Sequence, residues 1–229
     1  MNVLITGACG GLGSAMARQF AQFGADLLLV DKNGRELDIL SRSIEQSGYP
    51  EPGVCPLDLS TAVSDAYQQL VSIMAEQYEG LDVLIHCAAA FHGLQPIEHI
   101  SDQAWHETIQ VNLNAQFMLT KAALSLLKTS SSAQIVFILE DEDVSGQAYR
   151  GAYGAAKAAL ASLVGTMEQE LEGTSVSVLR VKPGPMRTGL RARAYHSEDP
   201  QSLLDPEEVA RNVVAQIKEI RDQSLRQAQ

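Results

Sequence analysis

Short apolar runs alternate with longer amphipathic stretches along most of this chain. The short runs predict six strands, at residues 2–6, 26–30, 54–57, 81–86, 134–139 and 175–181. Apolar positions at helical spacing predict helices at residues 11–23, 37–44, 62–78, 105–127, 148–171 and 206–221. Apolar strands that alternate with helices indicate a parallel sheet covered on both faces.

The order of these elements predicts a Rossmann-type, doubly wound α/β fold. Right-handed crossovers between parallel strands would give the strand order 3-2-1-4-5-6. No repeat, low-complexity segment or linker interrupts the pattern, so residues 1–229 are expected to form one domain. After the sixth strand the pattern becomes irregular over residues 185–204. A polar tail at 222–229 then follows the last helix in place of a seventh strand.

Composition narrows the class of protein. The 229 residues are 45% hydrophobic, which is enough for one sizeable core. No apolar run approaches the roughly 20 residues that span a bilayer, and the first residues lead into a strand rather than a signal peptide. The net charge of -11 disfavours nucleic acid or an anionic membrane as a partner. Apolar contexts favour buried thiols in a reducing cytoplasm for Cys9, Cys55 and Cys87.

A glycine-rich turn joins the first predicted strand to the first predicted helix. It runs from Thr6 to Gly13 and contains Gly7, Gly10, Gly11 and Gly13. Glycine is needed where a side chain would block a pyrophosphate or where the backbone takes unusual angles. The amides at the start of the following helix would face the phosphates. A tight turn alone would also need glycine, but the strand before it and the helix after it favour a dinucleotide site.

An acidic residue stands where the second strand is expected to end. Asp31 follows the last glycine of the turn by 18 residues. A carboxylate there can accept hydrogen bonds from the adenosine ribose, and it repels a 2′-phosphate. The sequence therefore predicts NAD, with NADP left open because Lys32 could face a phosphate. A capping or turn role is the alternative for Asp31. Asp58, after the third strand, could likewise bond the adenine edge or cap its own turn.

Tyr153 and Lys157 are four residues apart near the start of a predicted helix rich in alanine. Residues at that spacing share one helix face, with Cβ atoms about 5–6 Å apart. An ammonium at that distance stabilises a tyrosinate and lowers the pKa of the tyrosine, which gives a proton carrier for catalysis. Such pairs also occur by chance, but the nucleotide loop upstream favours the catalytic interpretation.

Taken in order, these motifs resemble the short-chain dehydrogenase/reductase family over nearly the whole chain. The matching pieces are the Thr6–Gly13 turn, Asp58, Trp105 with Val111-Asn112-Leu113, Tyr153 with Lys157, and Pro183-Gly184 with Thr188. The resemblance implies an oxidoreductase that interconverts a secondary alcohol and a carbonyl by hydride transfer with NAD(P)(H).

The resemblance also implies a role for each of these residues. Tyr153 would be the general acid/base, Lys157 would hold the nicotinamide ribose and tune Tyr153, and Asn112 would anchor a water that relays protons to Lys157. Residues 185–204 would form the substrate loop. The nicotinamide carboxamide would be positioned by Pro183, Gly184 and Thr188. Further contacts to the cofactor are expected from Leu12, Lys32, Leu59 and Ala88.

The chain departs from the family where a serine is usual, about 13 residues before the tyrosine. Glu140 stands there, and the nearest hydroxyl, Ser145, is only eight residues before Tyr153. An ionised carboxylate cannot donate the hydrogen bond that the serine gives to a substrate carbonyl. Losing one such donor typically costs about 10²–10³ in rate. The catalytic site is therefore expected to include Glu140 and to be impaired.

Several roles stay open for the acidic run that Glu140 begins, residues 140–143. Glu140 could be protonated and donate the bond itself, or the acids could form a solvated loop and leave Tyr153 to act alone. They could also favour a cationic substrate or the positive nicotinamide ring. A metal site is a further alternative, but four successive acids are more typical of a solvated loop. No metal is predicted.

Two further departures concern the fourth strand and the C-terminus. After the fourth strand the chain has His86-Cys87-Ala88-Ala89 where the family commonly has Asn-Asn-Ala-Gly. His86 is interpreted as structural, and a surface position is expected for His92, His99, His106 and His196. The absent seventh strand removes one common subunit interface. A homodimer through residues 105–127 and 148–171 is therefore predicted rather than a tetramer.

Three hypotheses for the function follow. The first is a cytoplasmic NAD-dependent oxidoreductase that acts on a small alcohol or carbonyl compound. The second is a catalytically impaired dinucleotide-binding protein, a sensor or interaction partner, which Glu140 and the altered fourth-strand motif favour. The third is a purely structural α/β domain. Loops around residues 91–100 and 188–204 would shape the pocket, and the sequence identifies neither the substrate nor the direction of the reaction.

Overall fold

Six parallel strands form one sheet in the order β3-β2-β1-β4-β5-β6 in the computed structural model, which describes residues 1–227 apart from the side chains at 142 and 227. The strands are β1 (Asn2–Thr6), β2 (Asp26–Asp31), β3 (Gly53–Pro56), β4 (Val83–His86), β5 (Ala133–Ile138) and β6 (Val176–Val181). The predicted fold class and strand order are confirmed. Within residues 1–227 no seventh strand joins the sheet.

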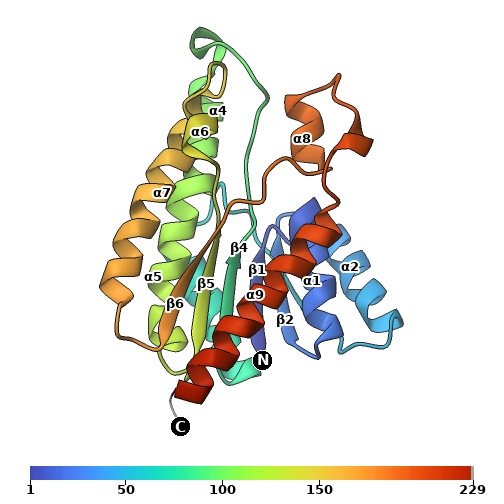
Figure 1. The fold of residues 1–229 in the computed structure, drawn as a ribbon, viewed down its shortest axis with the longest axis vertical. Helices are drawn as coiled ribbons and strands as arrows, with labels where there is room; N and C mark the ends of the chain where they lie inside the picture. Colours follow the sequence, from blue (N-terminus) through green and yellow to red (C-terminus); the bar gives the residue numbers. More distant parts are fainter. Residues whose placement is uncertain (228–229) are drawn as a thin grey trace.

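Helices cover both faces of the sheet, and the two layers are visible on either side of the strands (Figure 1). One face carries α1 (Gly11–Gln22), α2 (Gly34–Gln46) and α9 (Pro206–Gln227). The other carries α3 (Ser64–Tyr78), α5 (Ala115–Leu127) and α7 (Gly151–Leu171). Side chains alternate between the faces along each strand, so Val3 and Ile5 pack with the first layer and Leu4 with the second.

The two long helices differ from their predicted bounds. The helix expected at 105–127 begins earlier, at Asp102, where the Ser101 hydroxyl caps the amide of Ala104 at 3.2 Å. It is divided into α4 (Asp102–Ile109), a π-helical turn η2 (Gln110–Asn114) and α5. The helix expected at 148–171 begins only at Gly151, because Tyr149 takes a left-handed φ of 70°.

The C-terminal segment is helical further than predicted. The tail expected from residue 222 is part of α9 as far as Gln227, and residues 228–229 lie outside the described part. The helix is held at its far end because Arg221 pairs with Asp82 at 2.9 Å and donates to the carbonyl of Ser132 at 3.0 Å. None of the helices within residues 1–227 has the length and apolar character needed to cross a membrane.

The segment predicted to be irregular, 185–204, contains short ordered pieces. Thr188 caps a short helix, and an isolated bridge joins Met186 to Leu204 at the two ends of the segment. The short helical elements of the molecule are η1 (Ile97–His99), α6 (Glu142–Ser145), α8 (Gly189–Ala194) and η3 (Pro200–Ser202). The two ends of this loop, at Met186 and Leu204, therefore lie side by side before α9 begins.

Candidate active site

The glycine-rich turn lies at the carboxyl end of β1 and leads into α1. Gly7 has a φ of 66°, and a Cβ there would lie 2.5 Å from the backbone nitrogen of Ala88. A Cβ on Gly13 would lie 2.2 Å from the carbonyl oxygen of Gly7. The N-terminus of α1 has no side-chain cap among the described residues, so its first amides remain available to an anion. The glycine turn and these amides form a cradle, residues 7–13, that fits a dinucleotide pyrophosphate.

The segment after β6 lies against the same turn. A Cβ on Gly11 would approach Cγ2 of Thr188 to 2.7 Å, so Thr188 borders the glycine turn. Gly184 turns the chain with a φ of 71°. The Thr188 hydroxyl accepts a hydrogen bond from the amide of Arg191 at 3.2 Å. The structure thus brings the predicted carboxamide segment and the predicted phosphate turn together, although they are far apart in sequence.

Asp31 ends β2 beside the glycine turn. One carboxylate oxygen accepts the amide of Cys9 at 3.1 Å, and the other accepts the amide of Asn33 at 3.2 Å. The turn role that the sequence left open is therefore present, and the same bonds hold the carboxylate beside the cradle. Burial and the neighbouring Asp31 carboxylate raise the pKa of the Cys9 thiol to about 12.

The other predicted nucleotide contacts lie in different environments. Asp58 accepts both the amide and the hydroxyl of Ser60, at 2.9 and 2.7 Å, and these bonds lower the pKa of its carboxyl. The local capping role predicted as the alternative for Asp58 is thus present. Lys32 is exposed, whereas Leu12 and Leu59 are buried.

Tyr153 and Lys157 lie one turn apart on α7, and both side chains are buried. The Lys157 ammonium lies 5.7 Å from the centre of the tyrosine ring and donates to the carbonyl of Ile138 at 2.7 Å. Burial lowers the pKa of Lys157 to about 8. Burial and the Glu140 carboxylate raise the pKa of Tyr153. The net shift of the Tyr153 pKa is therefore upward, opposite to the expected lowering, because burial and the Glu140 carboxylate dominate.

Glu140 takes the position of the missing serine and faces the phenol. The Tyr153 hydroxyl donates to Oε1 of Glu140 at 3.4 Å, and Oε2 lies 3.7 Å from the guanidinium of Arg150. The next acid diverges from the site, since Asp141 pairs with Lys182 at 3.4 Å. The hypothesis that the whole run is a solvated loop is therefore wrong for Glu140. Ser145 lies on α6, and no cluster of potential metal ligands occurs within the described residues.

Asn112 is fully buried in the π-helical turn. Its amide nitrogen donates to the carbonyls of Ala90 and Thr108, both at 2.8 Å, which ties the segment after β4 to this helix. Its Oδ1 is buried and has no hydrogen-bond partner within the described residues. Leaving a buried oxygen without a hydrogen bond costs free energy, so we expect Oδ1 to accept one from a donor such as a bound water.

His86 has the structural role that the sequence predicts. Its Nε2 lies 2.9 Å from the hydroxyl of Thr120, and its ring stacks on Phe137 with centroids 4.9 Å apart. Burial lowers the pKa of His86 to about 3, so the ring is neutral. The other four histidines are exposed, as expected. The three cysteines are free, and each residue is partly buried where buried thiols were expected.

Arg150 has no counterpart in the sequence-based prediction, and Tyr195 and Phe91 are predicted only as parts of the pocket loops. The buried guanidinium of Arg150 donates to the hydroxyl of Tyr195 at 2.8 Å, and the edge of Phe91 packs against Tyr153 with ring centroids 5.2 Å apart. Arg150 is three residues before Tyr153, a spacing that places both on one helix face. That spacing was the available signal for Arg150. Tyr195 lies in the predicted substrate loop, but nothing in the sequence distinguishes it from its neighbours there, because its position depends on how the loop folds.

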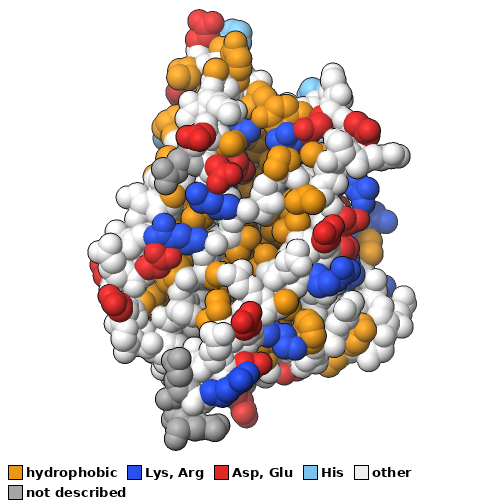
Figure 2. Space-filling view, in the orientation of Figure 1, with side chains coloured by type: hydrophobic (Ala, Val, Ile, Leu, Met, Phe, Trp, Pro, Cys, Tyr) orange, Lys and Arg blue, Asp and Glu red, His pale blue; other side chains and the backbone are white. Residues whose placement is uncertain are grey.

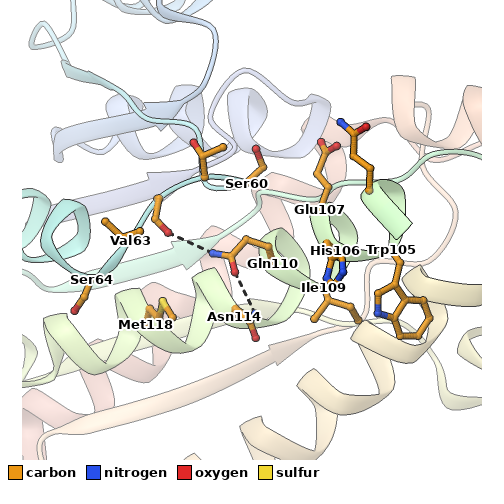
Figure 3. Close-up of a pocket in the computed structure, with 13 residues that line it drawn as sticks. Ser60, Val63, Ser64, Trp105, His106, Glu107, Ile109, Gln110, Asn114 and Met118 are labelled. Carbon is orange, nitrogen blue, oxygen red and sulfur yellow. Dashed lines mark hydrogen bonds between the residues drawn. The ribbon is translucent and has the colours of Figure 1, made fainter. Parts of the chain in front are cut away.

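A groove of about 610 Å³ lies away from these residues, along the outer side of α4 and η2 (Figure 3). Trp105 lines it and is 42% exposed. Gln110 lines the groove, and its amide nitrogen donates to the carbonyl of Ala62 at 3.4 Å (Figure 3). Neither Tyr153 nor Lys157 borders this groove, so it is separate from the candidate active site.

Comparison with known proteins agrees with this geometry. Residues 1–199 match the family model described as short chain dehydrogenase. An Escherichia coli K12 protein called uncharacterized oxidoreductase YciK is 34% identical over 207 residues, which cover 90% of this chain and 82% of that protein.

Solved structures extend the match to the fold. A short chain dehydrogenase from Salmonella enterica serovar Typhi superposes with a TM-score of 0.90 at 31% identity, covering 97% of this chain and 90% of that one. A structure from Escherichia coli CFT073 complexed with NADPH has a TM-score of 0.89 at 33% identity, covering 98% and 92%. The chain therefore belongs to the short-chain dehydrogenase family and is an NAD(P)-dependent oxidoreductase.

Proposed function

We propose that this protein is a cytoplasmic, NAD-preferring oxidoreductase that interconverts a small secondary alcohol and a carbonyl compound, with Tyr153 as general acid/base. The observation that carries the proposal is the buried Tyr153–Lys157 pair on α7. Family membership supplies the oxidoreductase class, and the residues around the pair supply the proton chemistry.

The protein's own residues account for the proton rather than the hydride. The nicotinamide, when bound, gives or accepts the hydride. Tyr153 is kept protonated by burial and by Glu140, so it can give its proton to an alkoxide as this forms. Asn112 offers an unpartnered acceptor at Oδ1, which suits a water-mediated proton path toward Lys157.

Asp31 supports the preference for NAD. Its carboxylate is held beside the cradle by the amides of Cys9 and Asn33, where it can accept ribose hydroxyls and would repel a 2′-phosphate. Bound NADPH in the Escherichia coli relative is a property of that protein, so the preference is a proposal for this chain.

Calorimetry with NAD and NADP tests the cofactor preference. We expect NAD to bind more tightly to the wild-type protein, and Asp31→Asn to narrow the ratio of the two affinities by about 10-fold or more, because a charge at the ribose is lost. Asp38→Asn, on the exposed side of α2, is the matched control and should leave the ratio unchanged. Equal affinities in the wild-type protein would contradict the NAD proposal.

A dinucleotide-binding protein without turnover is the second candidate function. The observation that favours it is the hydrogen bond from Tyr153 to Glu140, because the phenol is engaged with a carboxylate where the family has a serine donor. A screen of alcohols and carbonyl compounds, followed by the absorbance of reduced nicotinamide, separates the two. Turnover supports the enzyme, whereas tight cofactor binding with no turnover supports the sensor or interaction partner.

We also propose a homodimer through the outer faces of α4, α5 and α7. Trp105 and Phe117 are large apolar side chains on these helices, exposed to 42% and 40%. A face with exposed aromatic side chains is typical of a subunit interface. Light scattering is expected to give twice the mass of the chain, and Trp105→Glu should shift the protein toward monomer. A monomeric wild-type protein would contradict this proposal.

A further inference from the structure

Arg150 brings a positive charge into the interior of the site. Its side chain is only 8% exposed. The turn before α7 fixes its direction: Tyr149 has a φ of 70°, and Gly151 has a φ of 28° where a Cβ would lie 2.1 Å from Cδ1 of Ile100. Such unusual backbone angles persist only when the surroundings impose them. A buried guanidinium is costly unless partners compensate its charge, so its contacts indicate its role.

The guanidinium of Arg150 has partners on two sides. Nη2 donates to the hydroxyl of Tyr195 in the substrate loop at 2.8 Å. Nη1 lies 3.7 Å from Oε2 of Glu140, and the other oxygen of that carboxylate accepts the Tyr153 phenol. Arg150 therefore stands between the loop and the carboxylate that contacts the general acid/base.

Tyr195 is held as part of a small folded unit within the loop. The guanidinium of Arg191 lies 3.8 Å above the ring of Tyr195. Arg191 in turn makes two hydrogen bonds to the carboxylate of Glu198, both at 2.6 Å. Bidentate arginine–carboxylate pairs are directional. The position of the Tyr195 hydroxyl is therefore linked to the position of the loop as a whole.

We propose that Arg150 is a positioning residue that couples the substrate loop, through Tyr195, to the placement of Glu140 against the phenol of Tyr153. The inference rests on the proposed role of Tyr153. With the loop in place, Arg150 is shared between the hydroxyl and the carboxylate, and Glu140 is kept on the phenol. When the loop moves away, Arg150 loses its hydroxyl partner and Glu140 loses its fixed neighbour.

Hydrogen exchange measured by mass spectrometry tests this coupling without a substrate. The loop amides of residues 192, 195 and 198 are hydrogen-bonded and report loop opening. We expect Tyr195→Phe and Arg150→Gln each to speed exchange in 189–198 by about 10-fold or more, because a charged hydrogen bond is lost. Arg150→Lys keeps the charge without the planar fork and should have an intermediate effect.

Glu140→Gln is the decisive variant. Among the contacts of the described residues, Glu140 bonds Tyr153 and pairs with Arg150 and makes no polar contact with residues 189–198. If Arg150 transmits the coupling, Glu140→Gln speeds exchange in 189–198 in the wild-type background and has no further effect in Arg150→Gln. If Glu140→Gln leaves the loop unchanged while Arg150→Gln loosens it, Arg150 only supports the fold and the proposal is overturned.

A matched control and an activity measurement complete the test. Arg187→Gln breaks another ion pair at the loop, with Asp205, and should leave the effect of Glu140→Gln on exchange in 189–198 unchanged. Once a substrate is known, Tyr195→Phe should lower kcat in the wild-type background but not in Glu140→Gln. A protein with no turnover would contradict the proposed enzyme, yet the exchange experiment would still decide the role of Arg150.

Discussion

Tyr153→Phe is expected to lower kcat by about 10²–10⁴-fold with any substrate that the wild-type protein turns over. The substitution removes only the hydroxyl that donates to Glu140 and would carry the proton, and it keeps the ring that packs on Phe91. Cofactor affinity should change little, because the glycine cradle and Asp31 are untouched. Steady-state kinetics and calorimetry on the same preparations measure both effects.

Tyr149→Phe is the matched control for this variant. Tyr149 is a tyrosine four residues earlier whose side chain is 58% exposed, so loss of its hydroxyl should leave kcat near the wild-type value. If Tyr153→Phe kept full activity, the proton would travel through another group, and Tyr153 would not be the general acid/base.

Gly7→Ala is expected to destabilise the protein by about 2–5 kcal/mol. About 1–2 kcal/mol comes from placing alanine in a left-handed conformation, and a further 1–3 kcal/mol, about the usual cost of overpacking, comes from the clash with the backbone of Ala88. The clash would displace the turn that leads into α1, so cofactor binding is expected to weaken in the fraction that folds. Denaturant unfolding with a linear extrapolation measures the free energy of unfolding.

Gly24→Ala separates the two contributions. Gly24 has a φ of 67°, nearly the value of 66° at Gly7, but a Cβ there meets nothing within 4 Å. We expect it to cost about 1–2 kcal/mol and to leave cofactor binding intact. Equal destabilisation by the two substitutions would show that the close approach of Ala88 to the turn contributes nothing.

Most of the fold was predictable because hydrophobic periodicity is a local property. The six strands and their order follow from apolar runs separated by helical patterns. The errors lie where the local pattern of apolar residues does not indicate the backbone conformation. The π-helical turn around Asn112 inserts a residue without any change in apolar character, and the start of α7 depends on the backbone of Tyr149.

The sequence predicts the candidate site as a set of residues but not as an arrangement. Glycine spacing, Asp31 and the Tyr153–Lys157 pair are short-range patterns with a direct chemical meaning. The direction of the Lys157 ammonium toward Ile138 depends on a carbonyl 19 residues away. The net upward shift of the Tyr153 pKa likewise depends on burial and on the contact with Glu140, which the spacing of Tyr153 and Lys157 does not predict.

The sequence alone determined the α/β class and the strand order, and it predicts the nucleotide turn and the residues able to move a proton. Each of these depends on the types of residues that stand close together in the sequence. Only the tertiary structure decided which partner each charge meets, because burial and distance set electrostatic interactions and both arise from contacts between remote segments. The arrangement of Glu140, Arg150 and Tyr195 is the clearest case, since three separate elements bring these side chains together.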